Sequence, residues 1–69
     1  MANLKQKFGK KLQVLRKASG LTQEQVAQKT NLTIESISNI ERGVHGPTFD
    51  NLEKIAKALN VEVKVLFDF

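Results

Sequence analysis

The chain has 69 residues, which suffice for one domain with a modest core but not for a deep cavity or a second module. It contains no cysteine, so disulfides and thiolate metal sites are excluded, which fits a reducing cytoplasm. The formal net charge of +4 suits a polyanionic partner, although ribosomal, membrane-surface and plain soluble domains share such a charge.

The first part of the chain predicts two short helices. Apolar residues recur at helical spacing in the first of them, which Asn3 can cap and Gly20 can end. The second helix begins after Thr22, whose side chain forms a capping box with Gln25. This helix is short, because the polar residues around Asn31 interrupt it.

Basic residues gather in the first predicted helix, ahead of the first acidic residue, Glu24. Lys5 and Lys7 fall in the first helical turn, where cations oppose the helix dipole. These lysines either contact an external anionic partner or form a solvated face.

Two further helices follow with similar signals. Thr33 can cap the third helix and Gly43 can stop it. After a loop, Thr48 can cap the fourth helix, and Asn60 is its expected end. The fourth helix has an apolar stripe that consists of Leu52, Ile55, Ala56 and Leu59.

The tail, residues 61–69, is open to two interpretations. Valine and phenylalanine alternate with other residues along it, which is the period of a strand. However, Val63, Leu66 and Phe67 would also form one face of a short helix. A strand would let two tails pair as an antiparallel ribbon, but with either conformation a dimer contact would lie at the end of the chain. The alternative is that the tail only closes the bottom of the domain.

Residues 23–42 have the pattern of a helix, a tight turn and a second helix. Ala27 falls where the two helices must approach closely, so a small side chain is needed there. Asn31 falls at the turn, where a left-handed backbone is expected and asparagine is well tolerated. The apolar positions that would lock the pair against the other helices are Val26, Leu32, Ile37 and Ile40.

The ordered set of motifs resembles the lambda-repressor-like, or Cro/phage-repressor (Xre), helix-turn-helix DNA-binding domains. The resemblance rests on Phe8-Gly9, Leu12 and Leu15-Arg16, on 20–27, on Leu32-Thr33, on 37–43, and on Pro47-Thr48 followed by 52–61. It implies an all-α, compact five-helix domain over residues 1–69, with a fifth helix built from 62–67. The chain departs from the family at two places. Asn31 stands where the family usually has glycine, and the loop 44–46 lacks the lysine or arginine that the family often has there.

The resemblance implies that helix 34–42 enters the major groove of double-stranded DNA. The outward side chains that would contact bases are Thr33, Ile34, Glu35, Ser38 and Asn39. Ile34 fits a thymine methyl group, Glu35 can accept from cytosine, and Asn39 can pair with adenine. The candidates for phosphate contacts are Gln23, Ser36, Arg42 and Thr48. The alternative is that these are ordinary surface residues or helix caps without a phosphate.

Two further sets of residues have structural roles. By resemblance, Arg16 and Glu41 form an internal ion pair that orients the recognition helix. If the helical face of the tail is buried, the apolar residues left over are Val61, Val65 and Phe69. They would join two copies on a palindromic operator, with recognition helices about 34 Å apart.

The predicted function is sequence-specific DNA binding by a small cytoplasmic transcription regulator, most simply a repressor. An antitoxin-like or adaptor module on the same fold is the alternative, because fold alone does not determine function. We expect no enzyme, since there is no phosphate-binding glycine loop and the acidic residues fit helix starts and ion pairs. His45 has no second histidine to complete a metal site, and we expect no cofactor, small-molecule ligand or membrane segment.

Overall fold

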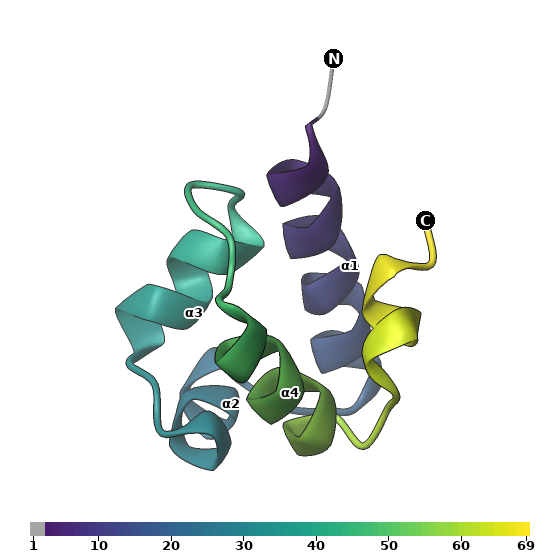
Figure 1. Ribbon diagram of the computed structural model, residues 1–69. Helices are drawn as coiled ribbons and strands as arrows, with labels where there is room; N and C mark the ends of the chain where they lie inside the picture. The colour runs from purple at the N-terminus through teal and green to yellow at the C-terminus, as the bar shows by residue number, and fades with distance from the viewer. Residues whose placement is uncertain (1–2) are drawn as a thin grey trace.

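A computed structural model describes residues 3–69 as a bundle of four α-helices and one 3-10 helix (Figure 1). The elements are α1 (Leu4–Ala18), α2 (Gln23–Thr30), α3 (Ile34–Glu41), α4 (Phe49–Ala58) and the 3-10 helix η1 (Val63–Phe67). Residues 1 and 2 of the expected domain lie outside the described range. Within residues 3–69 there is no strand, and no helix there has the length and apolar character needed to cross a membrane.

The predicted helix starts are confirmed. In α1 and α2 the capping box is complete, because the backbone N–H groups of Asn3 and Thr22 also donate to the side-chain oxygens of Gln6 and Gln25, respectively. The cap oxygens of Asn3, Thr22, Thr33 and Thr48 accept backbone N–H groups at 2.9, 3.1, 3.0 and 3.1 Å, respectively. These bonds satisfy amides that a helix start would otherwise leave without a partner.

The predicted stops are also confirmed, because each adopts a left-handed backbone. Gly20 and Gly43 have φ angles of 74° and 75°, and Asn31 and Asn60 have φ angles of 59° and 57°. Asparagine accepts this conformation at a lower cost than other side chains, so the asparagine at the turn after α2 does not change the fold.

The expected fifth α-helix is wrong, and so is the alternative strand. Residues 63–67 form a 3-10 helix whose start has no side-chain cap. Its Val65 N–H donates to Glu62 O at 3.0 Å, which is the shorter 3-10 spacing. Two β-branched valines in so short a segment do not favour a hydrogen-bonded α-helical turn.

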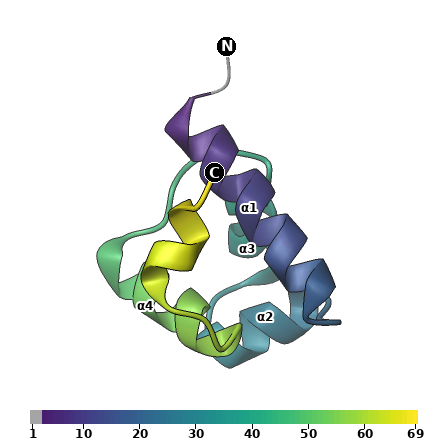
Figure 2. The same cartoon turned by 90° about the vertical axis from the view of Figure 1, so that its right-hand side faces the viewer.

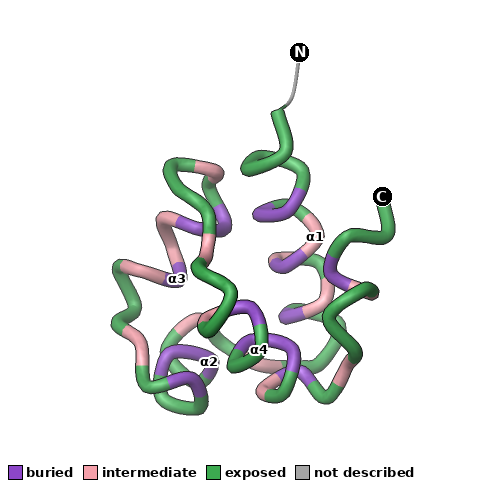
Figure 3. The backbone as a smooth tube through the Cα atoms, in the orientation of Figure 1, coloured by how far each residue is buried: buried purple, intermediate pink, exposed green. Residues whose placement is uncertain are grey.

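The core lies where all the elements meet (Figure 3). The fully buried aliphatic side chains include Leu12 of α1, Val26 of α2, Ile37 and Ile40 of α3, Ile55 of α4 and Leu66 of η1. α3 packs against α1 and α2, whereas η1 packs against α1 and α4. The tail therefore lies on the opposite side of the bundle from α3 (Figures 1 and 2).

A buried glycine allows α1 and α3 to approach closely. A Cβ atom at Gly9 would collide with the carbonyl oxygen of Ile40 and would lie 2.6 Å from that of Glu41. Both obstacles are backbone atoms, so a larger side chain at Gly9 requires the two helices to separate.

We expect Gly9→Ala to lower the free energy of unfolding by about 1–3 kcal/mol, although alanine is the better helix former. Gly20→Ala is a useful comparison, because a Cβ there meets no atom within 4 Å and only the left-handed backbone opposes it. Urea denaturation of both variants tests the effect. A stabilised Gly9→Ala variant would show that α1 and α3 are not in such close contact.

Candidate nucleic-acid interface

The turn between α2 and α3 fixes the direction in which α3 leaves the bundle. Ala27 is buried, and its carbonyl oxygen accepts the Leu32 N–H at 2.9 Å across the turn. Val26 and Ile37 are also buried, on the two sides of this turn. The pair α2–α3 is therefore held rigidly against the core, and the opposite face of α3 is directed to solvent.

The outward face of α3 contains the side chains predicted to contact bases. Thr33, Ile34 and Glu35 are exposed, and Ser38 and Asn39 are half-buried. Ile34 is 46% exposed, so its aliphatic side chain is available for an apolar contact on an otherwise polar face. Thr33 Oγ1 accepts the Ser36 N–H at 3.0 Å, and its hydroxyl hydrogen remains available to donate.

Asn39 and Arg42 contact one another at the end of α3. Arg42 Nη2 donates a hydrogen bond to Asn39 Oδ1. Among residues 3–69, no hydrogen bond from Asn39 Nδ2 is formed. The bidentate contact with adenine that the sequence suggested for Asn39 needs Oδ1 as an acceptor, and Arg42 already uses one of the two lone pairs of that atom.

Arg16 and Glu41 form a buried ion pair between α1 and α3. Arg16 Nε lies 2.6 Å from Glu41 Oε2, and Arg16 Nη2 lies 3.1 Å from Glu41 Oε1. The Arg16 and Glu41 side chains are only 10% and 2% exposed. Arg16 Nη1 also donates to Leu21 O at 2.9 Å, so the guanidinium joins α1 to the segment before α2.

Gln23 belongs to the same network, which the sequence did not reveal. Its Nε2 donates to Glu41 Oε1 at 3.1 Å, so one amide hydrogen of this predicted phosphate ligand points to the interior. The second amide hydrogen and the backbone N–H at the start of α2 remain for an external anion. Since Gln23 and Glu41 are 18 residues apart, no local pattern could have paired them.

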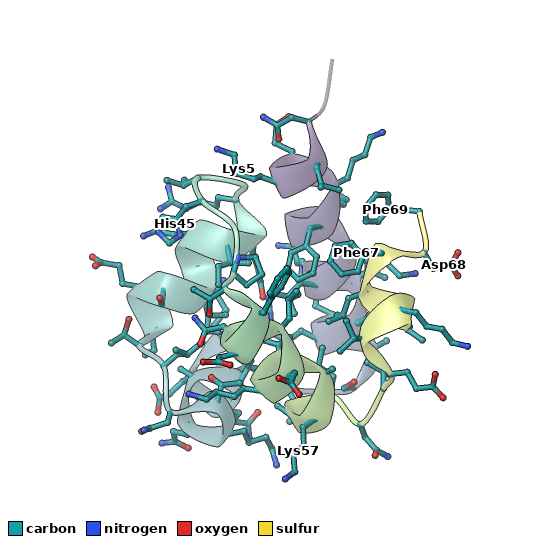
Figure 4. The ribbon with its side chains drawn as sticks, in the orientation of Figure 1. Lys5, His45, Lys57, Phe67, Asp68 and Phe69 are labelled. Carbon is teal, nitrogen blue, oxygen red and sulfur yellow. The ribbon has the colours of Figure 1, made fainter. Side chains whose placement is uncertain are left out.

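The loop between α3 and α4 is supported by the first turn of α1. A Cβ atom at Gly43 would lie 2.8 Å from Gln6 Cγ, and one at Gly46 would lie 3.7 Å from Lys5 Cγ. Figure 4 shows Lys5 extending from α1 towards the side of the molecule on which His45 lies. Lys5 thus brings a cation to a loop that has no lysine or arginine of its own, and sequence spacing alone could not have indicated this.

The tail exposes different apolar side chains from those predicted. Of the three residues expected to face inward, Leu66 is fully buried, whereas Val63 and Phe67 are exposed. Val61, which was expected to be left over, packs instead against the core. Val65 is half-buried and Phe69 is exposed.

Phe67 packs against two other phenylalanines, and Figure 4 shows it near Phe69 at the C-terminal end of the chain. The ring centroid of Phe67 lies 5.2 Å from that of Phe8 and 6.4 Å from that of Phe69. Phe67 also lines an apolar hollow of about 290 Å³ together with Leu4, Pro47 and Phe49. The exposed apolar surface of the tail is therefore formed by Val63, Phe67 and Phe69.

The described residues contain no group of three or more histidine, cysteine, aspartate or glutamate side chains that could hold a metal ion. His45 is exposed in the loop between α3 and α4.

Comparison with known proteins gives matches to helix-turn-helix regulatory proteins. Residues 12–66 match the HTH_3 family model, described as helix-turn-helix. Control protein C.BamHI of Bacillus amyloliquefaciens is 43% identical over 68 residues, which cover 97% of this chain and 84% of that protein. The immunity repressor protein of Bacillus phage phi105 is 36% identical over 58 residues, which cover 84% of this chain but 40% of that repressor.

A solved structure is similar over almost its whole length. The restriction-modification controller protein C.AhdI from Aeromonas hydrophila superposes with a TM-score of 0.88 at 39% sequence identity. The match covers 90% of this chain and 94% of that chain.

Proposed function

Because the chain belongs to the HTH_3 helix-turn-helix family of DNA-binding regulators, we propose that it binds a palindromic operator as a homodimer and controls transcription there. The observation that carries this proposal is the outward face of α3, where Ile34 and Glu35 are exposed beside a capped helix start. Repression is the simplest outcome, because occupying an operator is enough to exclude other proteins from it.

In this proposal α3 reads base edges and the surrounding helix starts hold phosphates. The base-reading side chains are Thr33, Ile34, Glu35, Ser38 and Asn39. Gln23, Ser36, Arg42 and Thr48 contact phosphates. Thr48 can act both as a cap and as a ligand, since Oγ1 accepts the Asn51 N–H at 3.1 Å while its hydroxyl hydrogen is free to donate. The position of Lys5 against the α3–α4 loop supports it as a further phosphate ligand.

A salt titration of DNA binding tests this assignment. If a dimer neutralises about four to six phosphates, the plot of log affinity against log salt concentration should have a slope near −4 to −5. Lys5→Ala should weaken binding to all sequences and make the slope shallower by about 1 per protomer.

Lys57→Ala is the matched control, because Lys57 is also exposed and lies at the end of the molecule opposite Lys5 (Figure 4). It should leave both the affinity and the slope unchanged. Equal effects of the two substitutions would contradict the proposed phosphate contacts. Failure to enrich any duplex from a random library would contradict the function itself.

The proposed dimer follows from the limited readout of a single recognition helix. A few base contacts, each worth about 1–3 kcal/mol, discriminate poorly among genomic competitors, and two half-sites double that readout. The assignment from the sequence to Val61, Val65 and Phe69 changes at Val61, which is half-buried and packs against the core. The exposed residues Val63, Phe67 and Phe69 are the better candidates for contact between two tails.

We expect Phe69→Asp to weaken self-association and operator binding together, because it places a charge on the proposed contact. Val14→Asp is the matched control, since Val14 is also about half exposed but lies on α1. Sedimentation with and without a palindromic duplex measures the association. A parent protein that stays monomeric on a single half-site under both conditions would contradict the dimer.

A further inference from the structure

The amide of Asn39 is held in one orientation at the end of the recognition helix. Arg42 Nη2 donates to Oδ1, and a bond of this kind is strengthened by the charge of the guanidinium. The Val44 N–H donates to Asn39 O at 2.9 Å and the Gly43 N–H donates to Ile40 O at 3.1 Å. These backbone bonds close the last turn and keep Asn39 and Arg42 next to each other.

The consequence is that the pair presents several hydrogen-bond donors and only one remaining acceptor lone pair. Nδ2 of Asn39 carries two hydrogens that no other group among residues 3–69 accepts, and the guanidinium has further N–H groups beyond the one that Asn39 uses. Asn39 is half-buried and Arg42 is exposed, so both can be reached from the groove side of α3. Only the second lone pair of Oδ1 remains as an acceptor here, and it lies beside the donors of the guanidinium.

Guanine is the base whose major-groove edge matches two adjacent donors, because it presents acceptors at both N7 and O6. Adenine presents one acceptor and one donor, and cytosine presents a donor. Thymine offers a single acceptor, O4, beside its methyl group. Pairing with adenine would place the N6 donor of that base beside the guanidinium donors that already face Asn39 Oδ1.

We infer that Arg42 sets the base specificity of Asn39, and that the two residues together read a guanine. This inference rests on the proposed function, in which α3 enters the major groove. Arg42 acts here as a positioning residue for the Asn39 amide, in addition to any phosphate that its other donors bind. The sequence pattern alone suggested adenine for Asn39, so the two readings make different predictions for the same base pair.

Selection of binding sites from a random duplex library, followed by titration of single-base variants, distinguishes these readings. The base pair contacted by Asn39 is the one whose preference disappears in Asn39→Ala. We expect the parent to favour guanine over adenine there by about tenfold, a typical size for one specific contact. Arg42→Ala removes the guanidinium donors beside Asn39 Oδ1 and should shift the preference at that base pair towards adenine.

Lys5→Ala serves as the control, since it should weaken all sites without changing the preferred base. Arg42 is exposed and outside the core, so its alanine variant keeps the fold, which a thermal melt verifies. A parent that selects adenine at this base pair overturns the inference, and so does an Arg42→Ala variant that still selects guanine. If the parent enriches no site at all, the proposed function fails, which is a different result.

Discussion

Glu41→Ala is expected to lower the free energy of unfolding by about 3–5 kcal/mol. The Glu41 carboxylate accepts bonds from Arg16 at 2.6 and 3.1 Å and from Gln23 at 3.1 Å, and its side chain is 2% exposed. Removing it leaves the buried Arg16 guanidinium without its counter-charge. Because a small domain has a total stability of only about 5–15 kcal/mol, such a loss is a large part of the whole.

The loss of stability comes mainly from the Arg16 guanidinium, which stays buried without a counter-charge. A double-mutant cycle can demonstrate this. Replacing Arg16 with Met and Glu41 with Leu together should cost much less than the sum of the two single replacements. Denaturant unfolding of the four proteins provides the measurement. Additive single effects would show that the two side chains do not depend on each other.

A second ion pair in the same chain provides the control. Lys64 Nζ and Glu62 Oε2 are 3.5 Å apart, but the two side chains are 82% and 77% exposed. Water screens this pair, so Glu62→Ala should change the stability little. The comparison separates the effect of burial from that of charge pairing as such.

Helix starts and stops could be predicted because their signals are local. A threonine cap accepts the N–H of the residue three positions later, and a glycine or asparagine stop depends on its own left-handed backbone. Each signal therefore involves only a few neighbouring residues. The tail could not be resolved in this way, because its valines and phenylalanines fit a strand and a short helix equally well. Its conformation follows instead from the burial of Leu66 against α1 and α4.

In the candidate site, too, features set by neighbouring residues could be predicted, whereas contacts between residues distant in the sequence could not. The local helix-turn-helix motif and the family that it resembles placed Thr33, Ile34 and Glu35 at the outward start of the recognition helix. The contact of Gln23 with Glu41 and the approach of Lys5 to Gly46 join residues far apart in the chain. Such contacts depend on how the helices pack, so neither composition nor periodicity indicates them.

Leu66→Ala is the second substitution with a large expected effect, because one side chain anchors η1. Leu66 is 0% exposed, and η1 packs against both α1 and α4. Truncation removes buried apolar surface and leaves a cavity, which costs about 2–5 kcal/mol for a leucine. We expect a correspondingly lower urea midpoint with little change in its slope, provided that unfolding remains two-state.

Phe69→Ala is the matched control, because Phe69 lies in the same tail but is 55% exposed. Measured in the monomer, at low protein concentration, its truncation should cost far less than that of Leu66. Similar small losses for the two variants would mean that the tail is not anchored to the bundle. A large loss for Leu66 alone would establish that the tail completes the core through this residue, while its phenylalanines remain available at the surface for a partner.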